Sequence, residues 1–324
     1  MMDITNGVDM TIKIKEGITF NDFDTRENDM YLIDRSAPTP AEKEIIESVP
    51  FAHGVYDFSN ILGERIFSNR TISYTFHIHE HDYDRRKHEQ TVLENKLLGT
   101  HITRLEDSYD GDYYYLGKCV SINTTDDHVY NRLIVLVEFD CYPFKISKLP
   151  EGHDIWDEFN FELDVAQPVS YTMDGEYTFK ELPIGSTATI GAWATTYASG
   201  GGKIPIGNIG ISGTITGMEY VTSSRSKRAY NVTGIDGLVV EQDIIQAHIN
   251  PLKVTLINAG TASVTPKLDL TAKATIVKGN RSYNFVEGGQ YENGDFRIDS
   301  GENKLTIYSF HQNEIEFNFH KELI

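Results

Sequence analysis

The amino-acid sequence predicts a mainly β protein of two domains, and three observations support this fold class. Several runs alternate apolar with polar residues and are rich in Val, Ile, Thr, Tyr and Phe, which is typical of half-buried strands. The run 82–99 has the composition of a helix instead. Residues 145–154 mix charge with Pro and Gly after an aromatic strand end, which indicates a domain boundary near Leu149. At 324 residues, the chain is long enough for two cores.

The first domain, 1–148, is predicted to be a β domain with one helix. Its strands are expected at 10–21, 70–80, 113–125 and 132–144. For the helix, Asp82 or Asp84 is suited to cap the N-terminus, and Gly99 is suited to end it in the left-handed conformation. The C-terminal half is expected to dock on the sheet, while 84–90 stays in water; the apolar positions of that half are Val92, Leu93, Leu97 and Leu98.

The second domain, 149–324, is predicted to be a β-sandwich with an insertion. Short strands separated by turns at regular intervals occur over 254–285, 296–310 and 303–320, which favours a sandwich. Between 182 and 218 the only charged residue is Lys203, and glycine recurs throughout. This change in composition indicates an inserted module, and its Ile and Thr content favours β-hairpins over disorder.

Composition narrows the classes of function. Twenty-nine Lys and Arg against 48 Asp and Glu give a net charge of −19, which repels nucleic-acid backbones and anionic lipid. A channel lined with acidic residues would nevertheless let DNA pass without binding it.

No targeting or membrane segment is expected from the sequence. No basic segment precedes an apolar core at the N-terminus, so no secretory signal is expected, and the charge-poor run 182–202 is too rich in Gly, Ser and Thr for a membrane helix. The two cysteines, Cys119 and Cys141, are expected to be buried apolar residues of adjacent strands.

A histidine run raises the question of a metal site. His77, His79 and His81 are spaced two apart, and side chains two apart share one face of a strand, so three imidazoles could converge on Zn, Cu, Fe or Ni. The alternative is an ordinary strand with the histidines and Thr75 on its outer face and apolar residues on its inner face. We favour the second interpretation, because no other ligand motif has the spacing of a metal site.

No catalytic or cofactor site is predicted. The chain lacks a G-x-S-x-G elbow, a phosphate loop and an H-E-x-x-H motif, and the SGGGK stretch at 199–203 fits a hairpin tip better than a phosphate cradle. The carboxylates of 157–164 are expected on a solvated face rather than in a glycosidase site.

Trp193 and Tyr197 are the residues best suited to an exposed recognition surface. Aromatic side chains beside Gly and Ser offer a large contact area on an adaptable backbone, which suits a partner protein or a glycan. The alternative is that Trp193 anchors the core of the insertion itself. Both interpretations stay open at this point.

The first domain resembles the distal tail (Dit) proteins of long, non-contractile-tailed bacteriophages. The resemblance rests on four stretches that occur in the order of that family: ITFNDFDTRENDMYLIDRS, VPFAHGVYDFSNILGERIFSNRTISYTFHI, HEQTVLENKLLGT and RLIVLVEFDCYPFKIS. In the second domain, LINAGTASVTPKLDL and FRIDSGENKLTIYS resemble the galectin-like sandwich of the same family, with IWDEFNFELDVAQP (155–168) as its expected opening strand. Residues 171–247 exceed what a minimal member of the family needs.

The resemblance implies a structural role without enzymatic activity. Members of this family form a homohexameric ring in the virion tail tip, where the ring joins the tail tube to the tip or baseplate and lets DNA pass. The implied partners are other copies of the chain, the tail tube protein and a tail-tip protein, after synthesis in the host cytoplasm. The insertion is expected to hold a receptor-binding protein or to bind a host cell-wall saccharide. Two other classes remain: a glycan-binding adhesin acting through Trp193 and Tyr197, and a metal enzyme using the histidine run.

Overall fold

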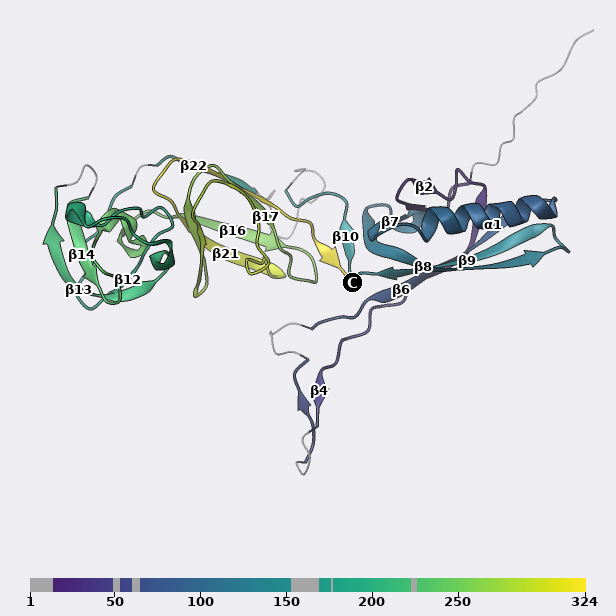
Figure 1. Ribbon diagram of the computed structural model, residues 1–324, viewed down its shortest axis with the longest axis horizontal. Helices are drawn as coiled ribbons and strands as arrows, with labels where there is room; N and C mark the ends of the chain where they lie inside the picture. Colours follow the sequence, from purple (N-terminus) through teal and green to yellow (C-terminus); the bar gives the residue numbers. More distant parts are fainter. Residues whose placement is uncertain (1–13, 49–52, 60–64, 153–168, 176, 223–225) are drawn as a thin grey trace, which may run out of the picture. The chain divides into compact units, whose positions relative to one another are not determined.

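The computed structural model describes residues 14–48, 53–59, 65–152, 169–175, 177–222 and 226–324, and it is mainly β (Figure 1). The chain divides into two compact units, one formed by Met1–Lys148 with Glu322–Ile324 and the other by Leu149–Lys321. The last three residues, assigned from the sequence to the second domain, belong to the first unit. The reason is that strand β23 (Glu322–Leu323) pairs antiparallel with strand β10 (Lys145–Ser147).

The first unit is built on one antiparallel sheet. Its strands follow the order β2-β1-β7-β8-β9-β6-β3, and β10 pairs with both β8 and β23. Along β6 one face is buried and the other is partly open, as the period of two predicts. The strands are β1 (Ile18–Phe20), β2 (Phe23–Asp24), β3 (Met30–Ser36), β6 (Arg70–His79), β7 (Thr103–Asp107), β8 (Tyr113–Asp127) and β9 (Arg132–Cys141).

The two cysteines lie in β8 and β9, which are neighbours in this sheet. Cys119 is paired with Phe139 and Cys141 with Gly117. Both thiols are free and buried, so the prediction of two small apolar core residues is confirmed. Burial raises the pKa of Cys141 to about 12 and that of Cys119 to about 11, which keeps both thiols protonated and unreactive at neutral pH.

The predicted helix is present as α1 (Tyr83–Leu97), packed on one face of the sheet (Figure 1). Asp82 caps it by accepting a hydrogen bond from the Asp84 backbone N–H at 2.9 Å, and Leu93 and Leu97 enter the core. Two expectations were wrong. Leu98 ends the helix in the right-handed conformation, so Gly99 provides no left-handed stop. Arg86 is buried rather than solvated, because its guanidinium pairs with Asp126 of β8 at 2.5 Å.

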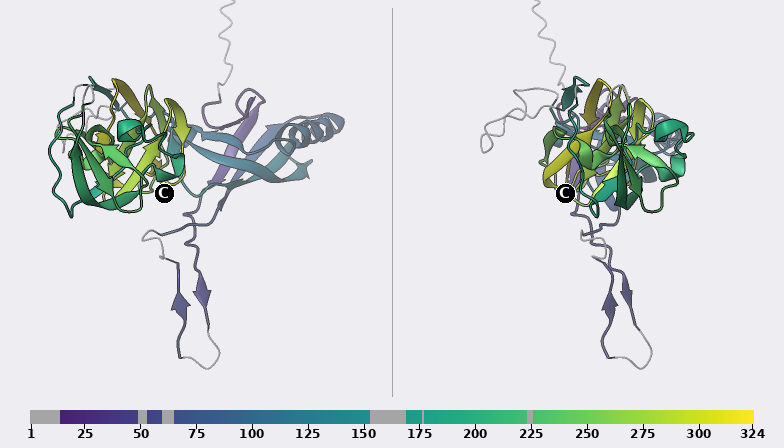
Figure 2. Two further views of the ribbon diagram at one scale, coloured as in Figure 1. Left: turned by 60° about the vertical axis from the view of Figure 1, so that its left-hand side comes forward. Right: turned by 90° about the vertical axis from the view of Figure 1, so that its left-hand side faces the viewer.

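Residues 37–69, which we call the arm, connect β3 to β6. The described parts of the arm include the strand pair β4 (Ile46–Glu47) and β5 (Tyr56–Asp57), and further bonds such as Lys43 N–H to the Ile66 carbonyl at 2.7 Å continue the ladder. Figure 2 shows this ribbon from two further directions, and in both it extends away from the sheet of its own unit. Within the described residues of the first unit, no second layer covers the faces of the arm.

The second unit contains a β-sandwich. One sheet has the order β11-β22-β17-β20 and the other β16-β21-β18-β19, and side chains from both enclose a single core with Leu256, Leu268 and Phe317. The predicted opening strand at 155–168, with its carboxylates, lies outside the described residues. The strands are β11 (Ser170–Met173), β16 (Leu252–Asn258), β17 (Lys267–Leu270), β18 (Ala274–Lys278), β19 (Arg281–Phe285), β20 (Gly289–Glu292), β21 (Gly301–Tyr308) and β22 (Asn313–Asn318).

The insertion is a separate β module between β11 and β16. The expected start at Tyr171 was too early, because Tyr171 pairs with Ile315 of the sandwich, so the module begins after Met173 and spans 174–251. The antiparallel pairing of β12 with β13 confirms the β-hairpin predicted within 182–218, and the sheet has the order β12-β13-β14-β15 with its own apolar cluster. Its strands are β12 (Thr187–Thr189), β13 (Ser212–Tyr220), β14 (Arg228–Val232) and β15 (Leu238–Val240).

Candidate functional site

The histidine run does not bring three imidazoles together. His77 and His79 share one face of β6, with their rings 6.3 Å apart and perpendicular, whereas His81 lies beyond the end of the strand and is exposed. The Nη1 of Arg132 donates to His77 Nδ1 at 3.1 Å, so a cation occupies the position beside this ring nitrogen. Burial, and then the charge of Arg132, lower the pKa of His77. Within the residues that the structure describes, no group of three His, Cys, Asp or Glu side chains has the arrangement of a metal site.

Trp193 and Tyr197 are both buried, which favours the second of the two interpretations left open by the sequence, the core anchor, over an exposed recognition surface. Their exposed fractions are 3% and 7%. The Trp193 indole N–H donates to the Gln242 carbonyl at 2.8 Å, and the Tyr197 hydroxyl accepts from the Asn208 side-chain amide at 2.9 Å. Neither ring is free to stack on a sugar, because Tyr197 belongs to the module's own apolar cluster and Trp193 packs against His248.

Glycines explain why these two rings can pack so closely against the backbone. A Cβ at Gly191 would lie 2.5 Å from the Trp193 indole, and a Cβ at Gly237 would lie 2.8 Å from the Tyr197 ring. Gly237 also has a φ of 124°, which other residues rarely adopt. The glycine-rich composition of the module therefore serves ring packing at these positions rather than flexibility.

The module joins the sandwich through an aromatic cluster around His248. The imidazole lies 5.3 Å from Tyr177, 5.1 Å from Phe179, 5.2 Å from Trp193 and 6.1 Å from Tyr308, the last of which belongs to the sandwich strand β21. His248 is 5% exposed, its Nε2 is 2.9 Å from the Gln242 carbonyl, and burial lowers its pKa. The partners of His248 are far apart in the chain, so no sequence pattern predicted this cluster.

A buried clamp holds the root of the arm on the first unit. Arg35, at the end of β3, donates from Nε and Nη2 to the two carboxylate oxygens of Asp107, each at 2.6 Å, and the Tyr74 hydroxyl donates to Asp107 at 3.0 Å. Asp107 also accepts from the Tyr109 backbone N–H at 2.9 Å, which satisfies it further. A bidentate pair with these additional bonds positions the strand that leads into the arm.

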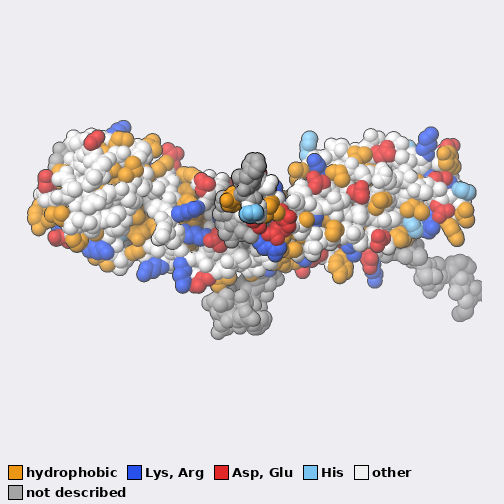
Figure 3. Space-filling view, turned by 90° about the horizontal axis from the view of Figure 1, so that it is seen from below, with side chains coloured by type: hydrophobic (Ala, Val, Ile, Leu, Met, Phe, Trp, Pro, Cys, Tyr) orange, Lys and Arg blue, Asp and Glu red, His pale blue; other side chains and the backbone are white. Residues whose placement is uncertain are grey.

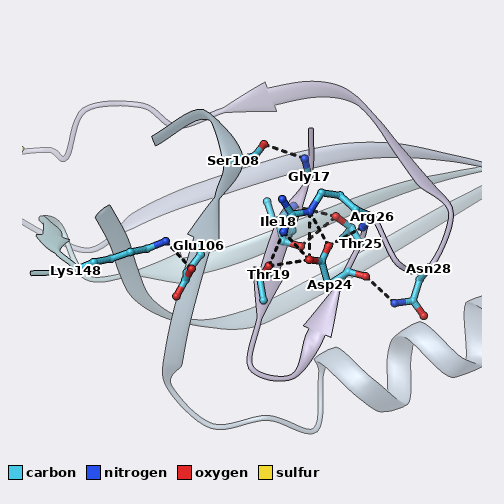
Figure 4. A network of polar contacts seen from close by, with 10 residues as sticks. All are labelled: Gly17, Ile18, Thr19, Asp24, Thr25, Arg26, Asn28, Glu106, Ser108 and Lys148. Atoms are coloured by element: carbon cyan, nitrogen blue, oxygen red, sulfur yellow. Dashed lines mark hydrogen bonds and ion pairs between the residues drawn. The ribbon is translucent and has the colours of Figure 1, made fainter. Parts of the chain in front are cut away.

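A second polar network fixes the N-terminal hairpin beside this clamp (Figure 4). The Thr25 hydroxyl accepts a hydrogen bond from the Ile18 backbone N–H at 2.9 Å and donates to the Ile18 carbonyl at 3.1 Å. Arg26 forms an ion pair with Asp24 at 2.5 Å. The hydrogen bond from Arg26 holds the pKa of Asp24 below its usual value. Nearby, Lys148 pairs with Glu106 of β7 at 2.6 Å. The contacts of Thr25 and Arg26 hold the hairpin of β1 and β2 together, and the Lys148–Glu106 pair ties the end of the first unit to β7, the ladder neighbour of β1.

The described part of the arm exposes apolar side chains on both of its strands. Val55 is 60% exposed and Tyr56 is 56% exposed, and the rings of Tyr56 and Phe58 stack at 6.4 Å. Ile45 and Ile46 on the facing strand are 39% and 48% exposed. Figure 3 looks along the arm, where hydrophobic side chains lie open beside charged ones. An exposed apolar surface of this kind is typical of contact regions.

Comparison with known proteins gives similarity of structure only. No family model matches the chain, and no curated protein sequence matches it. A crystal structure of the phage SPP1 Dit protein, described as a paradigm of the hub adsorption apparatus in phages infecting Gram-positive bacteria, is similar with 10% identity and a TM-score of 0.47, covering 94% of this chain and 98% of that one. The phage P2 baseplate in its activated conformation with Ca has a chain similar at 9% identity and a TM-score of 0.35, covering 92% of each chain.

Proposed function

We propose that the chain is a structural, non-enzymatic hub protein of a phage tail tip, whose first unit assembles with other copies of itself into a ring. The observation that carries this proposal is the arm. A two-stranded ribbon is marginally stable alone in water, yet this one exposes five apolar side chains and is rooted by the Arg35–Asp107 clamp. A fixed root and an uncovered apolar ribbon are what a contact with a neighbouring copy requires.

The resemblance to the Dit family supplies the finer parts of the proposal. The ring is a homohexamer that joins the tail tube protein to a tail-tip or baseplate protein and lets DNA pass, and the net charge of −19 suits a passage that does not retain DNA. The module at 174–251 holds a receptor-binding protein or contacts a host cell-wall saccharide. The site for either ligand is not at Trp193 or Tyr197, because both rings are buried.

The test is the mass of the purified protein by light scattering over a concentration series, with negative-stain images of the same samples. The wild type should form particles of about six subunits with a central opening. Tyr56→Asp should shift the equilibrium toward monomer, because a carboxylate would be desolvated in the contact. Val129→Asp is the matched control, since Val129 is 70% exposed in the turn between β8 and β9, away from the arm. A wild type that remains monomeric at the highest concentration would refute the ring.

A further inference from the structure

A buried arginine at the root of the arm has no carboxylate partner among the described residues. Arg70 is the first residue of β6, directly after the arm, and it is 7% exposed. Its Nη1 donates to the Pro38 carbonyl, at the other side of the root, at 3.3 Å. Among the described residues its Nε and Nη2 are buried and have no hydrogen-bond partner. These two nitrogens form the edge of the guanidinium that binds a carboxylate in a bidentate manner.

The position of this edge is set by packing. The guanidinium lies over the Tyr115 ring, 4.6 Å from its centroid, so the plane of the cation is fixed against β8. Arg70 is also paired with Cys141 of β9 in the sheet ladder. The arginine is therefore built into the sheet and is not a surface side chain that samples solvent.

Two carboxylates near this position, Asp107 and Asp110, are already used by other cations. Burial raises the pKa of Tyr115, and the charges that also act on it are those of Arg70, Lys145, Asp110 and Asp107. Asp110 accepts from Lys145 at 2.6 Å. Asp107 is taken by the bidentate pair with Arg35. Of the three cations at the root, Arg70 is thus the one that has no carboxylate among the described residues.

A buried, unpaired cation is costly, and a group of this kind is retained where a partner completes it. The location beside the arm indicates where that partner comes from, because the arm is the surface proposed above to meet another copy. The chain also has a surplus of carboxylates, with 48 Asp and Glu against 29 Lys and Arg. A neighbouring copy can therefore supply the acid.

We propose that Arg70 is the receptor for a carboxylate of a second copy of this chain, and that the pair forms as the arm root adjusts on assembly. This inference rests on the proposed ring function. It assigns to Arg70 the role of positioning one copy on the next in a head-to-tail contact, in which each copy offers Arg70 on one side and the acid on the other.

The test compares Arg70→Met with wild type and with Arg85→Gln. Met keeps the length and apolar stem of Arg70 without its charge, and Arg85 is a matched surface arginine whose side chain is 73% exposed. Arg70→Met should weaken association by roughly 30-fold or more, as expected when one partner of a buried charge pair is removed. Its thermal midpoint, measured at a concentration where the protein is monomeric, should equal or exceed that of wild type. Arg85→Gln should associate like wild type.

A second variant identifies the partner. In Arg70→Lys, a carbodiimide couples the lysine amine to a contacting carboxylate, forming an amide while the reagent takes up the water as a urea. Mixing ¹⁴N- and ¹⁵N-labelled copies before coupling should give linked peptides of mixed isotope. Links of one isotope only, or a thermal midpoint that falls in Arg70→Met while association stays unchanged, would overturn the inference and leave the ring intact. Links to a different tail protein in virions, in place of another copy, would also overturn it. A wild type that never associates would refute both proposals.

Discussion

Asp243 provides the sharpest test of how burial controls the stability of the module. The residue lies in a short 3₁₀ turn (Glu241–Asp243), is 4% exposed, and its pKa is raised from 3.8 to about 7 by burial. No charge contributes to this shift, so the cause is the loss of water around the carboxylate. Replacing Asp243 with Asn keeps the shape and removes the titration.

The magnitude follows from the pKa. In the unfolded chain the carboxyl ionises near 3.8, whereas in the folded chain it stays protonated up to about pH 7. Between these values the folded state binds more protons, so the free energy of unfolding falls as pH rises. The loss is at most about 4 kcal/mol at pH 8, at 1.36 kcal/mol for each pH unit between the two pKa values. The cost of burying an amide in the variant does not depend on pH and offsets part of the gain.

The assay is urea unfolding followed by the fluorescence of Trp193 in a Trp156→Phe background, at pH values from 4 to 8. Relative to its parent, Asp243→Asn should gain free energy of unfolding as pH rises, with a total change approaching 4 kcal/mol. Asp236→Asn, an exposed carboxylate in the same module, is the control and should show no such trend. A difference between Asp243→Asn and its parent that stays constant from pH 4 to 8 would refute the reasoning.

Three further predictions follow from packing and charge. Acid should weaken the cluster around His248, because burial lowers the pKa of this imidazole. Below about pH 6.5 the unfolded chain therefore takes up the proton before the folded chain does, and the free energy of unfolding falls. Between pH 7 and pH 5 the urea midpoint should fall less in His248→Gln than in wild type. Asp107→Ala should lower the free energy of unfolding of the first unit by about 3 kcal/mol, since Arg35 loses its carboxylate. A double-mutant cycle with Arg35→Met, followed by circular dichroism, should show coupling between the two residues, and additive effects would contradict the clamp. Gly191→Ala should lower the thermal midpoint because its Cβ would overlap the indole, at a cost of about 1–3 kcal/mol, whereas Gly207→Ala, which has open space, should change it little.

Local patterns predicted the elements that depend on local chemistry. The alternation over 70–80 predicted β6 because the side-chain period of a strand is a property of the backbone itself. The capping position Asp82 and the buried Leu93 and Leu97 of α1 were predicted for the same reason. Arg86 was not, because its burial depends on Asp126, which lies forty residues away in β8.

The candidate sites depended on contacts that are distant in sequence, and there the sequence was less informative. The sequence around Trp193, rich in Gly and Ser, is compatible with an exposed contact and with a core anchor. Trp193 is buried because it contacts Gln242 and His248, which lie about fifty residues further along the chain. Likewise, the apolar residues of the arm look like those of any half-buried strand. Alternation indicates that one face is apolar, but it does not indicate whether a second layer covers that face.

The second unit is inserted in sequence between β10 and β23, two paired strands of the first unit. The first unit is thus the host domain and the second unit is the inserted guest domain. The chain leaves the first unit after Lys148 and returns at Glu322, and the two crossing points lie on adjacent strands, which are about 5 Å apart. Because β23 follows the second unit in the sequence, the host sheet gains this strand only after the guest has been synthesised. A domain that replaced the guest would therefore have to bring its own two ends to that spacing for β10 and β23 to pair.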